Sequence, residues 1–127
     1  MGERKEMTRQ IRMSWNRFDN AARKLAKKIQ NSKVKISSVY GNPRGGIILA
    51  VRLSHLLDVP LITETWKTDV DTLFVDEIID TGKQMKDFHE NFKVATMWLN
   101  PQASFIPDFY VLLKPHNSWI VFPWEKK

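Results

Sequence analysis

The chain has 127 residues, about the size of one domain, and 43% of them are hydrophobic, so we expect residues 1–127 to form a single domain with its own core. It contains no cysteine, which excludes a disulfide scaffold, a thiol nucleophile and a cysteine-based metal site. A formal charge of +6 and a pI near 9.7 favour an anionic partner, and charge alone does not choose among nucleic acid, a membrane surface and a phosphorylated small molecule.

Apolar segments are short throughout the chain. No run approaches the roughly 20 apolar residues that span a membrane. Neither end carries an apolar, signal-like segment. We therefore expect a cytoplasmic protein with no membrane partner.

The predicted elements alternate between helices and strands. Residues 1–10 are polar and predicted to be flexible, and residues 14–32 place apolar side chains at helical spacing opposite a basic face. Strands that alternate with helices predict an α/β domain with a mainly parallel, twisted sheet flanked by helices. In chain order the remaining predicted elements are a strand at 34–41, a helix at 47–57, strands at 59–65 and 72–79, a helix at 83–92, a strand at 94–100 and two late strands, FYVLLK and WIVFPW.

The basic face of the first helix has two interpretations. It fits a nucleic-acid surface, but a solvated helix face is the commoner meaning of such a charge pattern. The basic residues are spread over the chain and are not interleaved with stacking aromatic residues. We therefore expect no nucleic-acid partner.

Two turns follow predicted strands and lead into predicted helices: GNPRGG after 34–41 and DTGKQ after 72–79. Ligands of an open parallel sheet bind beyond the carboxyl ends of its strands. A turn that opens a helix offers free backbone N–H groups, which suit a phosphate. The DTGKQ turn is therefore a candidate phosphate cradle.

Asp76 and Glu77 stand immediately before this turn. Alone, such a pair would be best interpreted as a solvated strand end. Beside a candidate phosphate cradle, it fits a different purpose: accepting hydrogen bonds from sugar hydroxyls, or supporting a Mg²⁺ shared with substrate oxygens. The residues that follow favour the site interpretation.

The stretch DEIIDTGKQM resembles the phosphoribosyl-diphosphate (PRPP) motif of type I phosphoribosyltransferases, in the version found in hypoxanthine-guanine enzymes. SWNRFDNAARKLA is similar to the first helix of bacterial xanthine-guanine enzymes, YGNPRGGI to their diphosphate loop, and NSWIVFPWE to their purine-binding tail, here residues 115–127. These blocks span nearly the whole chain in the family's order. The resemblance implies transfer of 5-phosphoribosyl from PRPP to a purine base of the hypoxanthine, guanine or xanthine type, with Mg²⁺ as cofactor and a homodimer or homotetramer as the assembly.

The resemblance also implies roles for individual residues. Asp76 and Glu77 would bind the ribose hydroxyls and Mg²⁺, and Asp80 would act as a general acid or base near the purine N7; these three form the implied catalytic set. The diphosphate loop of the family contains a non-proline cis peptide, expected here between Pro43 and Arg44. The other implied binding residues are Arg44 and Gly45 for diphosphate, Thr81, Gly82, Lys83 and Gln84 for the 5′-phosphate, and Asn100, Trp119, Ile120 and Glu125 for the base.

The sequence departs from the family pattern at three places. Asn100 stands where the purine enzymes have a lysine that donates to the purine O6, which leaves the preferred base open because an amide both donates and accepts. Residues 66–71, WKTDVD, replace a longer mobile lid, and Gln84 replaces a usual Thr or Ser. These departures leave an alternative function, a weakly active or inactive module that binds PRPP or a nucleotide.

Overall fold

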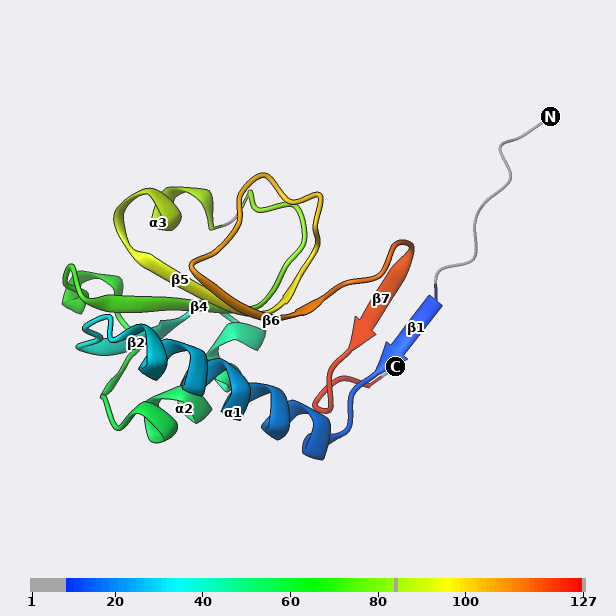
Figure 1. The fold of residues 1–127 in the computed structure, drawn as a ribbon, viewed down its shortest axis with the longest axis horizontal. Helices are drawn as coiled ribbons and strands as arrows, with labels where there is room; N and C mark the ends of the chain where they lie inside the picture. Colours follow the sequence, from blue (N-terminus) through cyan, green and yellow to red (C-terminus); the bar gives the residue numbers. More distant parts are fainter. Residues whose placement is uncertain (1–8, 84, 127) are drawn as a thin grey trace.

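The chain forms a five-stranded parallel sheet with helices on both faces and a small second sheet at one end (Figure 1). The structure is a computed structural model that describes residues 9–83 and 85–126. In chain order its elements are β1 Arg9–Arg12, α1 Trp15–Ser32, β2 Ser38–Gly41, α2 Gly45–Leu57, β3 Leu61–Ile62, the 3₁₀ turn Thr65–Lys67, β4 Thr72–Ile79, α3 Lys86–Asn91, β5 Lys93–Leu99, β6 Phe109–Leu113 and β7 Ser118–Val121.

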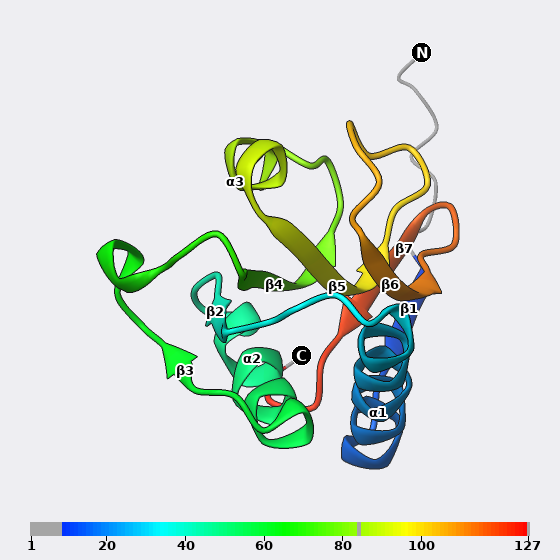
Figure 2. The same ribbon diagram turned by 60° about the vertical axis from the view of Figure 1, so that its left-hand side comes forward.

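The main sheet has the order β3-β2-β4-β5-β6, and every neighbouring pair is parallel. Helices α1 and α2 cover one face of it and α3 lies on the other (Figure 2). Strand β4 is the central strand, and its residues from Thr72 to Asp76 are all buried. Cover on both faces explains why this strand is a nearly continuous apolar run in the sequence. The predicted fold class is confirmed.

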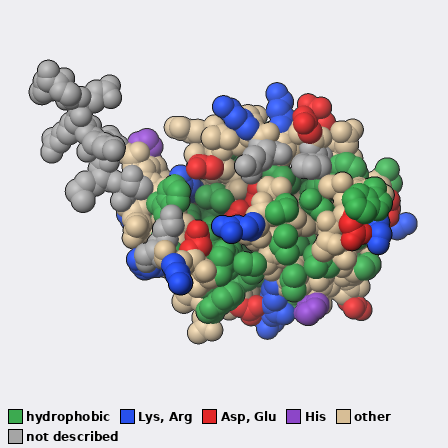
Figure 3. Space-filling view, turned by 180° about the vertical axis from the view of Figure 1, so that it is seen from behind, with side chains coloured by type: hydrophobic (Ala, Val, Ile, Leu, Met, Phe, Trp, Pro, Cys, Tyr) green, Lys and Arg blue, Asp and Glu red, His purple; other side chains and the backbone are tan. Residues whose placement is uncertain are grey.

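Helix α1 forms where the apolar spacing predicted it. Ser14 caps its first turn by accepting a hydrogen bond from the backbone N–H of Arg17 (3.1 Å), and Lys33 ends the helix in a left-handed conformation at φ 61°. Apolar residues such as Leu25 and Ile29 face the core, and the basic residues of the helix are exposed. On the opposite side of the molecule, basic side chains are scattered among acidic and apolar ones (Figure 3).

Three predicted elements are shorter than expected. The strand predicted at 34–41 is limited to Ser38–Gly41, because its neighbour β4 begins opposite Ser38 and gives the preceding residues no strand to pair with. The strand predicted at 59–65 is reduced to Leu61–Ile62, an edge strand that pairs with β2 alone. The helix predicted at 83–92 is limited to Lys86–Asn91, and Lys83 and Met85 lie in a turn before it.

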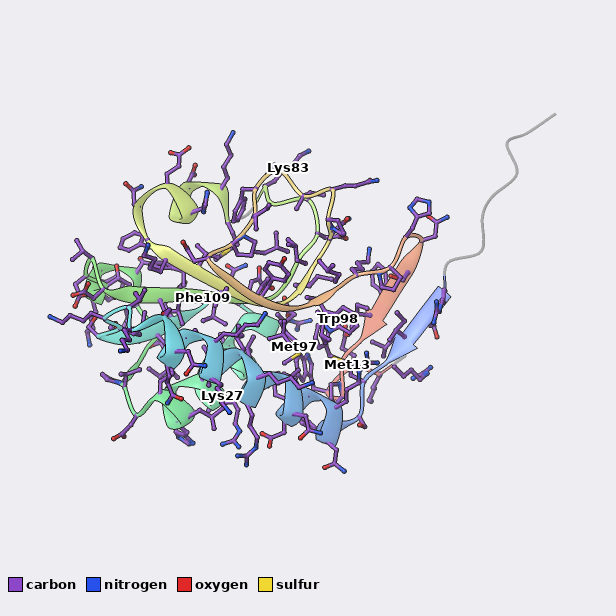
Figure 4. All side chains as sticks on the ribbon, in the orientation of Figure 1. Met13, Lys27, Lys83, Met97, Trp98 and Phe109 are labelled. Atoms are coloured by element: carbon purple, nitrogen blue, oxygen red, sulfur yellow. The ribbon has the colours of Figure 1, made fainter. Side chains whose placement is uncertain are left out.

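Strand β1 is a correction to the predicted flexible start, because Arg9 and Gln10 belong to it. It pairs in parallel with β7, with Gln10 opposite Trp119. Met13 anchors it: its backbone N–H donates to the carbonyl of Val121 (2.9 Å), and its sulfur accepts from the indole N–H of Trp98 (3.2 Å; Figure 4). The partner strand lies at the far end of the chain, so no local pattern in RQIR could predict the pairing.

Among the described residues, none of the helices combines the length and the apolar character needed to span a bilayer.

Candidate active site

The loop GNPRGG, residues 41–46, lies against the end of β4 that carries Asp76 and Glu77. Beyond the last paired residue of β2, the backbone N–H of Asn42 donates to the carbonyl of Val75 (2.8 Å) and its side-chain amide donates to Asp76 Oδ2 (3.0 Å). The next peptide, between Pro43 and Arg44, is cis, as the family resemblance implied. Arg44 itself is exposed, on the same rim of the sheet as the acids.

Two glycines allow helix α2 to begin in contact with the acid pair. A Cβ on Gly45 would overlap the carboxylate of Glu77. A Cβ on Gly46 would stand 2.7 Å from the carbonyl oxygen of Val75 and 3.2 Å from Cα of Asp76. Any side chain at these positions would push the loop and the acids apart. The glycines therefore bring the two segments together.

The acid pair is short of positive charge. Asp76 is 5% exposed and accepts hydrogen bonds from the backbone N–H of Glu77 (2.9 Å) and from Asn42. Burial raises the pKa of Glu77 well above its usual range, and the hydrogen bond to Asp76, the Asp76 charge and the Glu125 charge act in the same direction. A bound cation would relieve this repulsion.

The described residues fit Mg²⁺ shared with a substrate better than a closed metal site. No group of three or more potential metal-binding side chains occurs among them. Mg²⁺ is commonly held by one or two carboxylates together with substrate oxygens and water. Asp76 and Glu77 supply that number of carboxylates.

The phosphate turn follows two residues after the acids. Gly82 has φ +88°, a left-handed conformation that favours glycine, and a Cβ there would overlap the hydroxyl of Ser104. The hydroxyl of Thr81 accepts from the backbone N–H of Lys83 (3.3 Å), and its carbonyl accepts from Ser104 N–H (2.9 Å). Asp76 to Lys83, together with Met85, line a cleft of about 380 Å³. Lys83 lies in the loop region on the α3 side of the sheet (Figure 4), and Gln84 falls outside the described residues.

A second group of predicted residues gathers around Asp80. Its Oδ1 accepts hydrogen bonds from the amide of Asn100 (2.8 Å) and from the ammonium of Lys114 (3.2 Å). Trp119 is 49% exposed beside them, and Glu125 Oε1 accepts from the backbone N–H of Phe122 (2.9 Å). A cavity of about 170 Å³ is lined by Glu77, Ile78, Asp80, Lys114, Trp119, Ile120, Phe122 and Glu125.

Most of the predicted residues that the structure describes thus line three adjoining cavities, whereas Asn100 lines none of the three. Arg44 and Gly45 share one of about 620 Å³ with Glu77 and Glu125. Glu77 lines this cavity, the cleft of the phosphate turn and the cavity beside Trp119, so the three meet at its side chain. The segment at 66–71 contributes to none of these three.

Lys114 is a residue that sequence reasoning missed. A signal existed, because Lys114-Pro115 follows a predicted strand in the way that the family's lysine-proline pair follows the preceding strand. Asn100 occupies the position at which the family pattern places its lysine, so that pattern does not point to Lys114.

This architecture, a parallel sheet with an acid pair and a phosphate turn facing a glycine loop, places the protein among the type I phosphoribosyltransferases. The chain is similar to the crystal structure of a purine phosphoribosyltransferase from Pyrococcus horikoshii Ot3, with 33% identity, a TM-score of 0.77 and coverage of 93% of this chain and 95% of that one. The chain belongs to the purine phosphoribosyltransferase family.

Two further proteins are similar to this chain in sequence or in fold. Xanthine-guanine phosphoribosyltransferase of Idiomarina loihiensis is 24% identical over 142 residues, which cover 92% of this chain and 88% of the relative. A hypothetical protein from Neisseria gonorrhoeae with bound ppGpp shares the fold at 21% identity and a TM-score of 0.77, with 96% of this chain and 92% of that one covered. No family model matches the chain.

Proposed function

We propose that the protein transfers the 5-phosphoribosyl group of PRPP to a 6-oxopurine and releases diphosphate. The observation that carries this proposal is the contact between Gly45 and the Glu77 carboxylate. It brings the loop that bears Arg44 to the acid pair, and the phosphate turn follows on the same strand. A sugar phosphorylated at both ends needs two anion sites with hydroxyl acceptors between them.

The proposed roles combine the family resemblance with the cavities that the residues line. Arg44 and the backbone of Gly45 are proposed to bind the diphosphate, and Thr81, Gly82 and Lys83 the 5′-phosphate. Asp76 and Glu77 accept hydrogen bonds from the ribose hydroxyls and hold Mg²⁺, which when bound neutralises part of the charge on the leaving diphosphate. Each substrate end is thereby held on a different side of the ribose C1.

The base is proposed to lie between Trp119 and Asp80. A purine ring nitrogen forms the new bond to ribose C1 as the bond from C1 to the diphosphate oxygen breaks, and the bonding pair leaves with diphosphate. Asp80 takes the proton from N7 of the base. Trp119 stacks on the ring, the backbone of Ile120 contacts its edge and Glu125 fixes the tail through Phe122. Positioning and charge stabilisation supply the rate, and no covalent nucleophile is needed.

A second candidate function is a module that binds PRPP or a nucleotide without turnover. The short segment at 66–71 favours it, because the residues there line none of the three cavities and so give no cover against water. The related fold from Neisseria gonorrhoeae has ppGpp bound, which is compatible with either function.

Diphosphate release separates the two candidates. The protein would be incubated with PRPP, Mg²⁺ and, in separate reactions, hypoxanthine, guanine, xanthine and adenine. Release that depends on a 6-oxopurine supports the enzyme. PRPP binding by calorimetry together with no release on any base would refute the enzyme and support the module.

A further inference from the structure

Lys114 is held at the same rim as the acids by the main sheet. Its backbone N–H donates to the carbonyl of Leu99 (2.8 Å), which extends the pairing of β5 with β6 and places Lys114 beside Asn100. Its side chain is 15% exposed, and its ammonium lies 3.2 Å from Asp80 Oδ1. Lysine is rarely buried to this extent without a carboxylate partner.

Asn100 is already committed to structural contacts at both ends of its amide. Its Oδ1 accepts from the backbone N–H of Gln102 (3.0 Å), and its Nδ2 donates to Asp80 Oδ1 (2.8 Å). Lys114 has three N–H groups, and within the described chain Asp80 is its side-chain hydrogen-bond partner. Lys114 therefore retains donors for a ligand in the cavity that it lines with Trp119 and Asp80.

We propose that Lys114 is the residue that selects 6-oxopurines over 6-aminopurines. This inference rests on the proposed function, which places the base beside Asp80. The purine N7 and the substituent at C6 lie on one edge of the ring, so a group that contacts Asp80 is also close to the C6 substituent. A 6-oxopurine presents an acceptor, O6, at this position, whereas adenine presents an amino donor there.

The chemistry of the ammonium gives the direction of the preference. Lys114 can only donate, so it pairs with O6 and faces the adenine amino group donor to donor. If adenine is bound, the Lys114 ammonium has no acceptor at C6, and this weakens the binding of adenine. Sites built around such a hydrogen bond commonly prefer the correct ligand by about 10²-fold or more. Asn100 uses both ends of its amide in contacts with Asp80 and Gln102, so it does not supply the same selection.

Equilibrium binding of two mononucleotides tests the inference without requiring turnover. Inosine 5′-monophosphate carries the 6-oxo group and adenosine 5′-monophosphate the 6-amino group. Calorimetry should show that the natural protein prefers the inosine nucleotide by about 100-fold. Lys114→Met should reduce this preference to less than about 5-fold, mainly by weakening the inosine nucleotide.

Two further variants complete the design. Lys93→Met makes the same chemical change at the opposite end of β5, where Lys93 lies 3.8 Å from Asp108, and should keep the preference unchanged. Lys114→Gln carries an amide that donates or accepts, and should bind both nucleotides with similar affinity. Thermal unfolding followed by circular dichroism would establish that each variant is folded.

The outcomes distinguish this inference from the proposed function. Retention of the preference in both Lys114 variants, equal weakening of the two nucleotides, or no binding of either by the natural protein would overturn it. If the natural protein releases no diphosphate, and the Lys114 variants lose its preference for the inosine nucleotide, the results would refute the enzyme and support the inference. Turnover that is indifferent to Lys114 would refute the inference alone.

Discussion

Gly45→Ala tests whether the diphosphate loop and the acid pair depend on each other. The new methyl group would occupy the space of the Glu77 carboxylate, so that side chain must move. Displacing a packed group typically costs about 1–3 kcal/mol. Glycine to alanine within a helix otherwise gains about 0.5–1 kcal/mol, and Gly45 is the first residue of α2. The expected net loss of unfolding free energy is about 0–2.5 kcal/mol.

A double-mutant cycle isolates the contact. In a Glu77→Ala background there is no carboxylate to displace, so Gly45→Ala should be neutral or stabilising by up to about 1 kcal/mol. The coupling between the two positions should therefore be about 1–3 kcal/mol. Urea unfolding of the four proteins measures it, and PRPP titration should show weaker binding for each single variant.

Additive effects would refute the reasoning. If Gly45→Ala cost the same free energy with and without Glu77, the loop would not touch the acid pair in solution, and the argument for a shared diphosphate and ribose site would fail.

Three other predictions concern the acids and the exposed tryptophan. Asp80→Asn should lower kcat by about 10²–10⁴-fold with little change in PRPP affinity, and equal losses in both would contradict its role at N7. The pKa of Glu77 is higher in the folded state than in the unfolded state. Ionisation of Glu77 therefore lowers the free energy of unfolding as pH rises from the unfolded-state pKa toward the folded-state pKa, and it has no effect below the unfolded-state pKa. Between pH 5 and 8, the stability of Glu77→Gln relative to the natural protein should therefore increase with pH. The increase should be less than about 1.4 kcal/mol per pH unit, because solvent screens a half-buried group. A difference in unfolding free energy that does not change with pH would refute this prediction. Trp119→Ala should weaken nucleotide binding by about 1–3 kcal/mol and leave the melting temperature nearly unchanged, since the ring is 49% exposed; a large fall in melting temperature would show a structural role instead.

Local pattern was enough to predict the elements whose environment is uniform. The continuous apolar run of 72–79 and the helical spacing of 14–32 predicted β4 and α1 almost to the residue. A strand buried on both faces requires a continuous apolar run, and a helix buried on one face requires apolar residues at helical spacing. The order of the two turns relative to the acids likewise placed the candidate site. Backbone topology then dictates that parallel strand ends share one rim.

Tertiary structure decided the features that depend on distant partners. Arg9–Arg12 is a strand because residues 118–121 pair with it, and nothing within four polar-rich residues encodes that partner. Lys114 joins the site because β6 lies beside β5 and carries it to Asp80, although Asn100 occupies the expected position in the sequence. Sequence periodicity records which side of an element is buried. It does not record which other element covers that side, and the chemistry around Asp80 depends on that neighbour.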